Sequence, residues 1–506
     1  MHMNRLALAA LVLTSAALLS AHVGSPDTYY VGKAGPYGVQ VVIRAPQVIP
    51  ARAEVNVRVT GGGVTKVTAA PYIWNGGEKG APPPDVMTRA AGDSNMYVAH
   101  LWIMRGGSYS VRVHVEGSQG NGMAVVPFVA VATTVLAMDP KMGWGLAAFG
   151  LFLLVGLLTI VGAASRESTL EPGVDPDAAR VRRSWYVRAG AAVLIVTLLV
   201  LGRWWWNIEN AAYARGVYKP ALGTVALRDS NGVRVLHFSL ADSAQGIRAS
   251  TPLIPDHGKL MHLFLVKEDG SALAHLHPVT RDSLSFLAAL PATPPGKYRV
   301  FADVVHESGF AETMVGAAEV PEGGATTGVS DRDDALFAGL PAGNVATMAD
   351  KSTLTWEPGA GAIVAGQIAP LRFVVRDAKG APAGVEPFLG MAAHAVVVRD
   401  SGDVFVHLHP AGTTSMAAQE ALMARTDADT VRGAVAKRLE ENQMLAQMKE
   451  QMVMSYDPKK LLPGTITFPY AFPKAGTYRV WVQFRRGGVI RTAVFNALVA
   501  PAPTLP

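Results

Sequence analysis

The sequence predicts an all-β protein of three β-sandwich modules, with a two-helix transmembrane hairpin after the first module and a helical insertion in the third. Alternating apolar strands separated by Pro and Gly turns recur along the chain, and two long apolar runs interrupt them. The pattern Gly-x-Tyr-x-Val opens a long strand three times, at Gly107, Gly296 and Gly476. The modules span residues 22–140, 217–322 and 352–501, the last two joined by a linker at 323–350.

The composition narrows the class of protein. Half of the 506 residues are hydrophobic and 17% are charged, which favours β-sandwich modules with membrane segments over a cytosolic enzyme. The chain contains no cysteine, which excludes disulfides, thiolate metal sites and cysteine nucleophiles. The net charge of +6 includes no basic run of the kind that binds nucleic acid. No nucleic-acid partner is therefore expected.

The N-terminus has the pattern of a signal peptide over residues 1–21. Arg5 supplies the positive charge, an apolar core runs from Leu6 to Leu19, and small residues end at Ala21. This core is short for a membrane span, so cleavage is favoured over an uncleaved anchor. Cleavage after Ala21 makes His22 the first residue of the mature protein.

Two apolar runs predict the transmembrane hairpin at 143–206. The first continues from Gly143 to Ala163 and the second from Ala189 to Trp206. The loop between them, 164–188, is rich in arginine: Arg166, Arg180, Arg182, Arg183 and Arg188. The positive-inside rule assigns this loop to the cytoplasm. The protein is thus expected in the cytoplasmic membrane, with both major parts outside it, in the periplasm or outside the cell.

The second and third modules each contain one pattern of three histidines. These are His262, His275 and His277 in the second module and His394, His407 and His409 in the third, with the same gaps of thirteen and two residues. Each pattern predicts a β-hairpin around a short acidic turn that contains Gly. With the turn at the hairpin's centre, the first histidine lies opposite the second, and the third shares their face. Each hairpin therefore brings three imidazoles together.

Three neutral imidazoles suit copper, with zinc as the other candidate, and they leave a coordination position open. Supplementary ligands near the hairpins are His257, Met261 and His306 in the second module and Met391 in the third. The second module is the better candidate. In the third module the stretch that corresponds to His306 contains Arg485 and Arg486, which would repel a cation. The alternative is that the histidines are structural and bind backbone groups.

Two further features extend the metal hypothesis. A mature N-terminal His22 offers its α-amine and imidazole to one Cu(II), and His100 or His114 would complete that site; alternatively, His22 is incidental. The insertion at 413–455 is rich in helix formers and carries a stripe of methionines, Met444, Met448 and Met452. The stripe is either core packing or a Cu(I) site.

No enzyme is predicted. The chain has no nucleophile elbow, phosphate-binding Gly-rich loop or HExxH motif, and no small-molecule substrate is identified. A copper oxidase that uses His22 is a further alternative.

Several segments resemble known families. His22-Val-Gly-Ser-Pro-Asp, Gly35-Pro36-Tyr37 and the strand at Gly106–Val111 ahead of a span resemble the YtkA-like and FixH-like membrane-anchored sandwich proteins. The two histidine hairpins resemble segments of the same group, and the N-terminal histidine resembles that of CopC-like copper-resistance proteins. This resemblance implies immunoglobulin-like or cupredoxin-like extracytoplasmic domains. It also implies a role in copper handling, delivery or oxidase assembly beside an envelope or membrane protein partner. A metal-free envelope scaffold or assembly factor is the alternative function.

Overall fold

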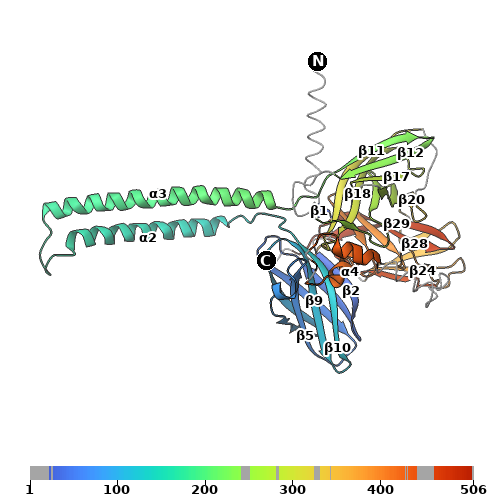
Figure 1. The fold of residues 1–506 in the computed structure, drawn as a ribbon, viewed down its shortest axis with the longest axis horizontal. Coiled ribbons are helices and arrows are strands. Elements are labelled where there is room, and N and C mark those ends of the chain that lie inside the picture. Colours follow the sequence, from blue (N-terminus) through green and yellow to red (C-terminus); the bar gives the residue numbers. More distant parts are fainter. Residues whose placement is uncertain are drawn as a thin grey trace, which may run out of the picture. The chain divides into compact units, whose positions relative to one another are not determined.

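The computed structural model describes most of the chain. The described residues are 22–23, 27–240, 251–280, 284–323, 331–341, 343–359, 361–427, 429, 431–441 and 461–503. The predicted signal peptide and the methionine stripe lie outside these residues. The chain divides into two compact units, of which one comprises residues 1–131 and 219–506 and the other residues 132–218. The predicted β-rich fold with two long apolar helices is confirmed (Figure 1).

Two sheets near the N-terminus, here the N-terminal sheet pair, enclose one hydrophobic core. The first sheet has the order β2 (Asp27–Ala34), β3 (Tyr37–Arg44), β4 (Ala51–Thr60), β8 (Asp93–Ile103) and β7 (Thr88–Ala90). The second has the order β10 (Gly120–Ala130), β9 (Gly107–Gly117), β5 (Val64–Ile73) and β6 (Asp85–Val86). Strand β3 buries every second residue, as expected for a strand with one face on a core. A 3₁₀ turn, η2 (Glu78–Gly80), follows β5.

The middle sheet pair carries the first histidine hairpin. One sheet has the order β11 (Gly223–Ser230), β12 (Val233–Leu240), β17 (Ser285–Ala289) and β16 (Val279–Thr280). The other has the order β13 (Leu253–Ile254), β18 (Gly296–His306), β14 (His262–Lys267), β15 (Ala272–Leu276) and β20 (Ala335–Ala338), and β19 (Ala311–Val320) also pairs with β18. Strands β20 and β21 (Val345–Thr347) both form within the segment 323–350, which the sequence predicts as a linker. Strand β20 pairs with β15, and β21 pairs with β22 (Thr353–Glu357) of the C-terminal sheet pair.

The C-terminal sheet pair carries the second histidine hairpin. Its smaller sheet has the order β21 (Val345–Thr347), β22 (Thr353–Glu357), β24 (Leu371–Arg376) and β27 (Thr465–Phe468). Its larger sheet has the order β1 (His22–Val23), β26 (Val404–Leu408), β25 (His394–Arg399), β28 (Gly476–Arg486), β29 (Val489–Ala500) and β23 (Ile363–Val364). Strand β1 is far away in sequence but pairs in parallel with β26.

The repeated Gly-x-Tyr-x-Val pattern forms the same local structure in all three sheet pairs. Each tyrosine hydroxyl donates to a carbonyl four residues upstream: Tyr109 to Arg105, Tyr298 to Pro294 and Tyr478 to Lys474. Immunoglobulin-like sandwiches contain this tyrosine corner. The glycine that starts each pattern has a positive φ of 129–145°. The motif therefore has a structural role, because it fixes the entry into the long strand.

The two sheets that carry the histidine hairpins also pack against each other. Strands β14 and β25 are buried on both faces, because one face lies on their own sheet pair's core and the other on a shared core. In this shared core the ring of Phe405 stacks on Phe301 at 4.1 Å and contacts Phe264 at 5.3 Å, measured between centroids. The faces of the two hairpins that carry the histidines both point toward this shared core.

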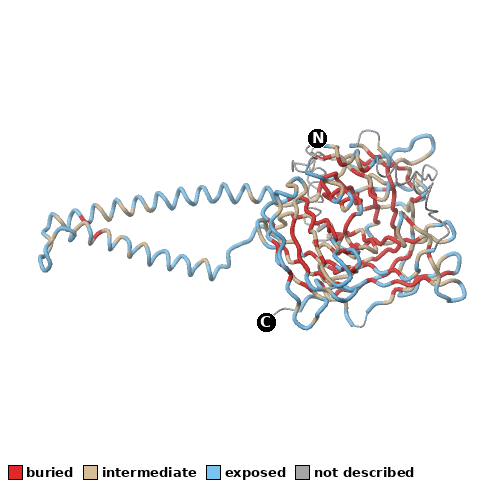
Figure 2. The backbone as a smooth tube through the Cα atoms, turned by 60° about the horizontal axis from the view of Figure 1, so that its bottom comes forward, coloured by how far each residue is buried: buried red, intermediate tan, exposed pale blue. Residues whose placement is uncertain are grey.

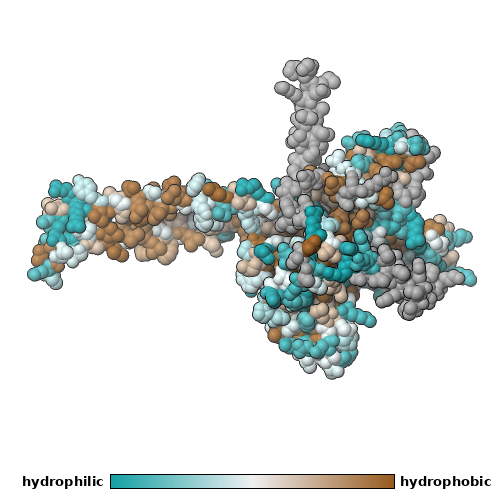
Figure 3. Space-filling model, in the orientation of Figure 1, coloured by the Kyte–Doolittle hydropathy of each residue, from teal (hydrophilic) through white to brown (hydrophobic). Residues whose placement is uncertain are grey.

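The second unit contains two long helices, α2 (Pro140–Glu167) and α3 (Ala178–Gly216). Both are long and apolar enough to cross a membrane. Figure 2 shows them almost entirely exposed, and Figure 3 shows apolar side chains along both and hydrophilic ones at the turn that joins them. Such exposed apolar surface is unfavourable in water and suits lipid. Both helices extend beyond the predicted spans, so the connection shrinks to residues 168–177.

The predicted insertion in the third module is partly described. It contains α4 (Met416–Ala424) and a second helical stretch at 434–441. Ser415 caps α4, because its hydroxyl accepts a hydrogen bond from the backbone N–H of Ala418. Apolar residues from both stretches pack with Ile254 and Val305 of the middle sheet pair. The insertion therefore joins the two sheet pairs that carry the histidines.

Candidate metal centre

Both histidine patterns form antiparallel hairpins, β14–β15 and β25–β26, but in a different register from the expected one. His275 lies opposite Phe264, and His407 lies opposite Val396, so the first and third histidines of each pattern lie opposite each other. The expected pairing of first and second histidines was wrong by two residues. The reason is that each hairpin is centred on a four-residue loop, 268–271 or 400–403, whose midpoint is also the midpoint between the first and third histidines. All three histidines of a hairpin still share one face.

One group of potential ligands comes from the first hairpin alone. The ligand atoms of His262, His275 and His277 all lie within 4.8 Å of one another, and all three residues are buried. We call this group the first triad. Strand β14 holds His262, strand β15 holds His275, and His277 follows directly after β15.

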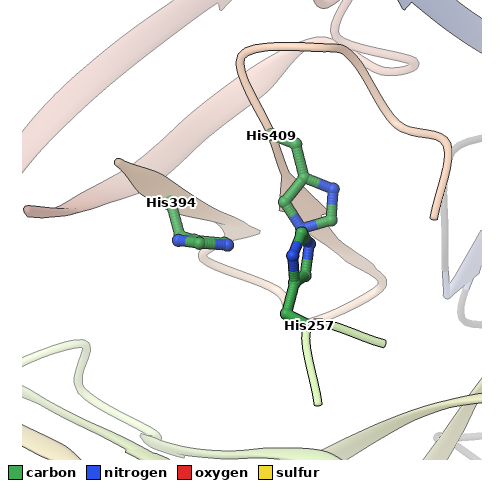
Figure 4. Close-up of side chains that lie close together, drawn as sticks. All are labelled: His257, His394 and His409. Atoms are coloured by element: carbon green, nitrogen blue, oxygen red, sulfur yellow. The ribbon is translucent and has the colours of Figure 1, made fainter. Parts of the chain in front are cut away.

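A second group combines both sheet pairs. The ligand atoms of His257, His394 and His409 lie within 4.8 Å of one another, and Figure 4 shows these imidazoles pointing toward one another. We call this group the second triad. His257 belongs to the middle sheet pair, whereas the sequence assigned it only to the surroundings of the first hairpin. The expected ligand His407 lies beside this triad, with its ring centroid 5.4 Å from that of His394 and 4.7 Å from that of His409.

A tight turn presents His257 to the second triad. The backbone groups of Asp256 and Lys259 exchange two hydrogen bonds of 2.9 Å around His257 and Gly258, which have φ values of 53° and 77°. Two successive positive φ values define a type I′ turn. Gly and Asn favour this conformation most, and other residues adopt it less often. The turn therefore fixes where the imidazole of His257 lies.

Helix α4 fixes the same turn from the other side. The carboxylate of Asp256 accepts a hydrogen bond of 3.0 Å from the backbone N–H of Ala417, in the first turn of α4. A carboxylate at this position also interacts favourably with the helix dipole. The chain after His409 is held as well, because Val31 donates its backbone N–H to the carbonyl of Ala411 at 2.7 Å. The insertion and the N-terminal sheet pair therefore support the loops of the second triad.

Burial keeps the imidazoles neutral. It lowers the pKa of His262, His275, His394 and His407 well below the usual value, and neighbouring imidazoles lower these pKa values further. Burial likewise lowers the pKa of His409 to about 4. Neutral imidazole is the form that binds a metal ion.

One ring nitrogen of His262 lies close to one of His275. The Nε2–H of His262 donates to the backbone carbonyl of Asp256 at 3.3 Å, and the Nδ1–H of His275 donates to the Oε1 of Gln483 at 2.8 Å. The remaining nitrogens, Nδ1 of His262 and Nε2 of His275, therefore carry lone pairs, and they face each other at 3.2 Å. Two imidazole ligands of one ion at roughly 2.0–2.1 Å are separated by about this distance.

Three more histidines have Nδ1 beside an oxygen acceptor. His277 lies 3.1 Å from a carboxylate oxygen of Asp334, His407 lies 3.4 Å from one of Asp303, and His409 lies 3.4 Å from the carbonyl of Thr414. A hydrogen bond from Nδ1 to a carboxylate or carbonyl leaves Nε2 for the metal, as in many metal sites. Burial raises the pKa of Asp303 to about 7.

The nitrogens that remain are buried and make no hydrogen bond within the part of the chain that the structure describes. They are Nε2 of His257, Nε2 of His277, both ring nitrogens of His394, Nε2 of His407 and Nε2 of His409. A buried polar atom without a partner costs free energy, and native proteins rarely tolerate several together. Metal ions at the two triads would satisfy one nitrogen of each ligand imidazole.

The other predicted site residues have the following surroundings. Met261 is fully buried in the core of the middle sheet pair. His306 faces Glu312 at 3.4 Å and the carbonyl of Thr251 at 3.2 Å. Met391 closes a turn with Phe388 through two backbone hydrogen bonds.

The N-terminal histidines are also separate from one another. The backbone of His22 pairs with Val404 in the C-terminal sheet pair. His100 pairs with Glu54, and His114 pairs with Met123, in the N-terminal sheet pair. The structure thus describes the backbone of His22 on a different sheet from the strands of His100 and His114.

The sequence did not identify the residues that orient the imidazoles. Gln483 and Asp303 are polar residues with apolar neighbours on both sides, and each would occupy a position on a buried face. That placement is a recognisable signal, because a buried polar side chain needs a partner. The two predicted basic residues have carboxylate partners: Arg485 contacts Asp333, and Arg486 lies 3.6 Å from Asp350.

The chain was compared with known families and structures. A family described as "Domain of unknown function (DUF8832)" matches residues 226–321, 346–432 and 443–501, and the first two stretches include every histidine of both triads and His407. No curated protein matches the chain.

Solved structures give only weak similarity. The tetra-tandem repeat from the extending region of a large adhesion protein is 9% identical, with 89% of this chain and 71% of that chain covered and a TM-score of 0.14. The Escherichia coli adhesin FdeC is 10% identical, with 94% and 98% covered and a TM-score of 0.14. The chicken CNTN1 FN1–FN3 domains are 8% identical, with 90% and 97% covered and a TM-score of 0.13. Such low TM-scores carry no argument.

Proposed function

We propose that this chain is a membrane-anchored, extracytoplasmic metal-binding protein whose ion is copper. Its role is to handle or deliver copper, or to assist oxidase assembly, beside an envelope or membrane protein partner. The observation that carries the proposal is the pair of lone-pair nitrogens of His262 and His275, which face each other at 3.2 Å. With the tautomers that the contacts to Asp256 and Gln483 favour, a cation between these two atoms makes their approach favourable.

The donor set favours copper. Both triads consist of imidazoles, which suit copper, zinc, iron and nickel, and a given nitrogen site binds Cu(II) most tightly among these divalent ions. Acidic residues are close but bind the imidazoles: Asp334 lies beside His277 and Asp303 beside His407. Three imidazoles leave a position open on the ion, as a protein that passes its ion to a partner requires. Zinc is the competing ion and is tested in parallel.

The proposed architecture places this site outside the cytoplasm. It consists of three immunoglobulin-like or cupredoxin-like sandwiches, a signal peptide over residues 1–21, and a transmembrane hairpin whose arginine-rich connection is cytoplasmic. The three tyrosine corners support the sandwich assignment. The two long apolar helices support the anchor.

The test is the metal content of the purified full-length chain in detergent. The wild-type protein is incubated with Cu(II), Cu(I) or Zn(II), desalted, and analysed by mass spectrometry for bound metal. The wild type should retain copper, and the double variant His275→Ala/His277→Ala should lose the copper of the first triad. His237→Ala is the matched control, because His237 lies on β12, whose paired strands are β11 and β17. A wild-type protein that takes up none of the three ions would refute the proposal.

A metal-free scaffold is the second candidate, and one observation favours it. His262 and His409 each place one ring nitrogen beside a backbone carbonyl, and the histidine faces lie against the shared core. In that case the histidines only hold the two sheet pairs together. The double variant would then lower the melting temperature sharply, while wild-type metal content would be negligible.

A further inference from the structure

The two hairpin sheets are related by an internal pseudo-two-fold arrangement. His262, His275 and His277 correspond in the repeat to His394, His407 and His409. The contacts across the interface are reciprocal. His275 binds Gln483, which pairs with His394, and His407 lies beside Asp303, which pairs with His262. Each sheet therefore orients the middle histidine of the other.

One position breaks this symmetry. The turn residue that corresponds to His257 is Leu389, and it has nearly the same backbone, with φ of 50° against 53°. Phe388 and Met391 exchange two backbone hydrogen bonds around Leu389, as Asp256 and Lys259 do around His257. The second triad thus gains a histidine from the opposite sheet pair, whereas the first triad does not.

His407 lies between the two triads. Its ring centroid is 5.3 Å from that of His262 and 5.7 Å from that of His275, and 4.7 Å from that of His409. Its Nε2 is buried and makes no hydrogen bond among the described residues. The triads also approach each other directly, since the rings of His257 and His262 are 6.3 Å apart. The seven imidazoles therefore form one continuous cluster.

We infer that this cluster is a dinuclear copper centre between the middle and C-terminal sheet pairs. His262, His275 and His277 hold one ion, and His257, His394 and His409 hold the other. His407 lies between the two triads and supplies a seventh donor atom, its Nε2. This inference rests on the proposed function, and it adds that the two ions are near neighbours whose binding joins the two sheet pairs.

The surrounding charge suits two cations. Three carboxylates border the cluster: Asp334 at 3.1 Å from His277, Asp303 at 3.4 Å from His407 and Asp256 at 3.9 Å from His257. Burying two positive ions is unfavourable unless negative charge is nearby. All three carboxylates offset the charge, and Asp334 and Asp303, which lie beside the Nδ1 of His277 and His407, also orient those two imidazoles.

The experiment combines copper stoichiometry with electron paramagnetic resonance on the full-length chain in detergent, loaded with Cu(II) alone. The wild type should bind two ions per chain. It should show either the half-field transition of two neighbouring Cu(II) spins or a loss of integrated signal through their coupling. His257→Asn should bind one ion and give the full signal of isolated Cu(II). Asn is accepted at a positive φ, so this variant should fold.

Leu389→Asn is the matched control, because it makes the same change to the corresponding turn outside both triads. It should retain two coupled ions. A wild-type protein with one ion, or with two ions at full signal and no half-field transition, would overturn the dinuclear centre and leave the proposed copper binding intact. A wild-type protein without copper would instead remove the proposed function and the inference together.

Discussion

His257 combines a strained backbone with a ligand position. Its φ of 53° in a type I′ turn is unfavourable for histidine, and its Nε2 is buried in the second triad. His257→Asn should therefore leave the free energy of unfolding of the metal-free protein unchanged or raise it by about 1 kcal/mol, because Asn adopts this conformation more easily. Chemical denaturation of the metal-free protein measures this difference. A large destabilisation would show that His257 has a packing role that its geometry does not indicate.

Asp334 orients His277 through two contacts. Its Oδ1 accepts the backbone N–H of His277 at 2.8 Å and lies 3.1 Å from the Nδ1 of the ring. Asp334→Asn keeps the shape of the side chain but removes its charge, so copper affinity should fall by roughly 10- to 100-fold, as for other residues that orient metal ligands. Competition with a chelator measures the affinity. An unchanged affinity would contradict the role of Asp334.

The ligand residues were more predictable than their grouping. The histidines of the two hairpins follow from the repeated spacing, because residues two apart on a strand share a face. That His257 joins His394 and His409 does not follow from spacing, because it depends on how two sheet pairs pack. The positive φ of His257 is a tertiary feature, although His257-Gly258 has the Gly that such a turn favours.

At the scale of elements, the sequence of the two hairpins indicates burial of both strand faces, which an alternating pattern does not predict. The strand His262–Lys267 is apolar at almost every position, which is typical of a strand buried on both faces. The same holds for His394–Arg399. This continuous pattern indicates a second packing surface, and so predicts that each hairpin sheet is covered by another layer. It does not predict which layer, and the four-residue loops shifted the register by two positions.

Helix α4 connects the insertion to the turn of His257. Ser415→Ala removes the N-cap hydrogen bond to Ala418 and should destabilise the helix by about 1 kcal/mol. Hydrogen exchange of residues 416–424 should become faster, and copper should be held less tightly at the second triad because Asp256 loses its helical partner. Hydrogen-exchange mass spectrometry with copper titration measures both effects. Faster exchange without any change in copper affinity would show that α4 does not support copper binding at the second triad.

At the scale of the whole molecule, the stability of the metal-free protein depends on pH. Burial lowers the pKa of five cluster histidines, so the unfolded chain binds more protons than the folded chain below about pH 6.5. Stability should therefore fall as pH drops through this value. Asp303 acts in the opposite direction, because its raised pKa favours the folded state at lower pH, but it is one group against five.

Thermal unfolding of the metal-free protein at about pH 7.5 and about pH 5 tests this dependence, with a clearly lower melting temperature expected at the acidic pH. Equal melting temperatures would mean that the imidazoles are solvated and not buried as a cluster. The burial of the cluster lowers these pKa values, because solvation of the charged form is lost.

The central claim is that buried imidazoles of two facing sheet pairs hold copper. X-ray absorption at the copper edge of the loaded full-length chain tests it most directly, because imidazole ligands give a distinctive outer-shell scattering pattern. The account predicts nitrogen ligands at roughly 2.0 Å with the scattering of about three imidazoles per copper. A shell dominated by oxygen, without imidazole scattering, would contradict it.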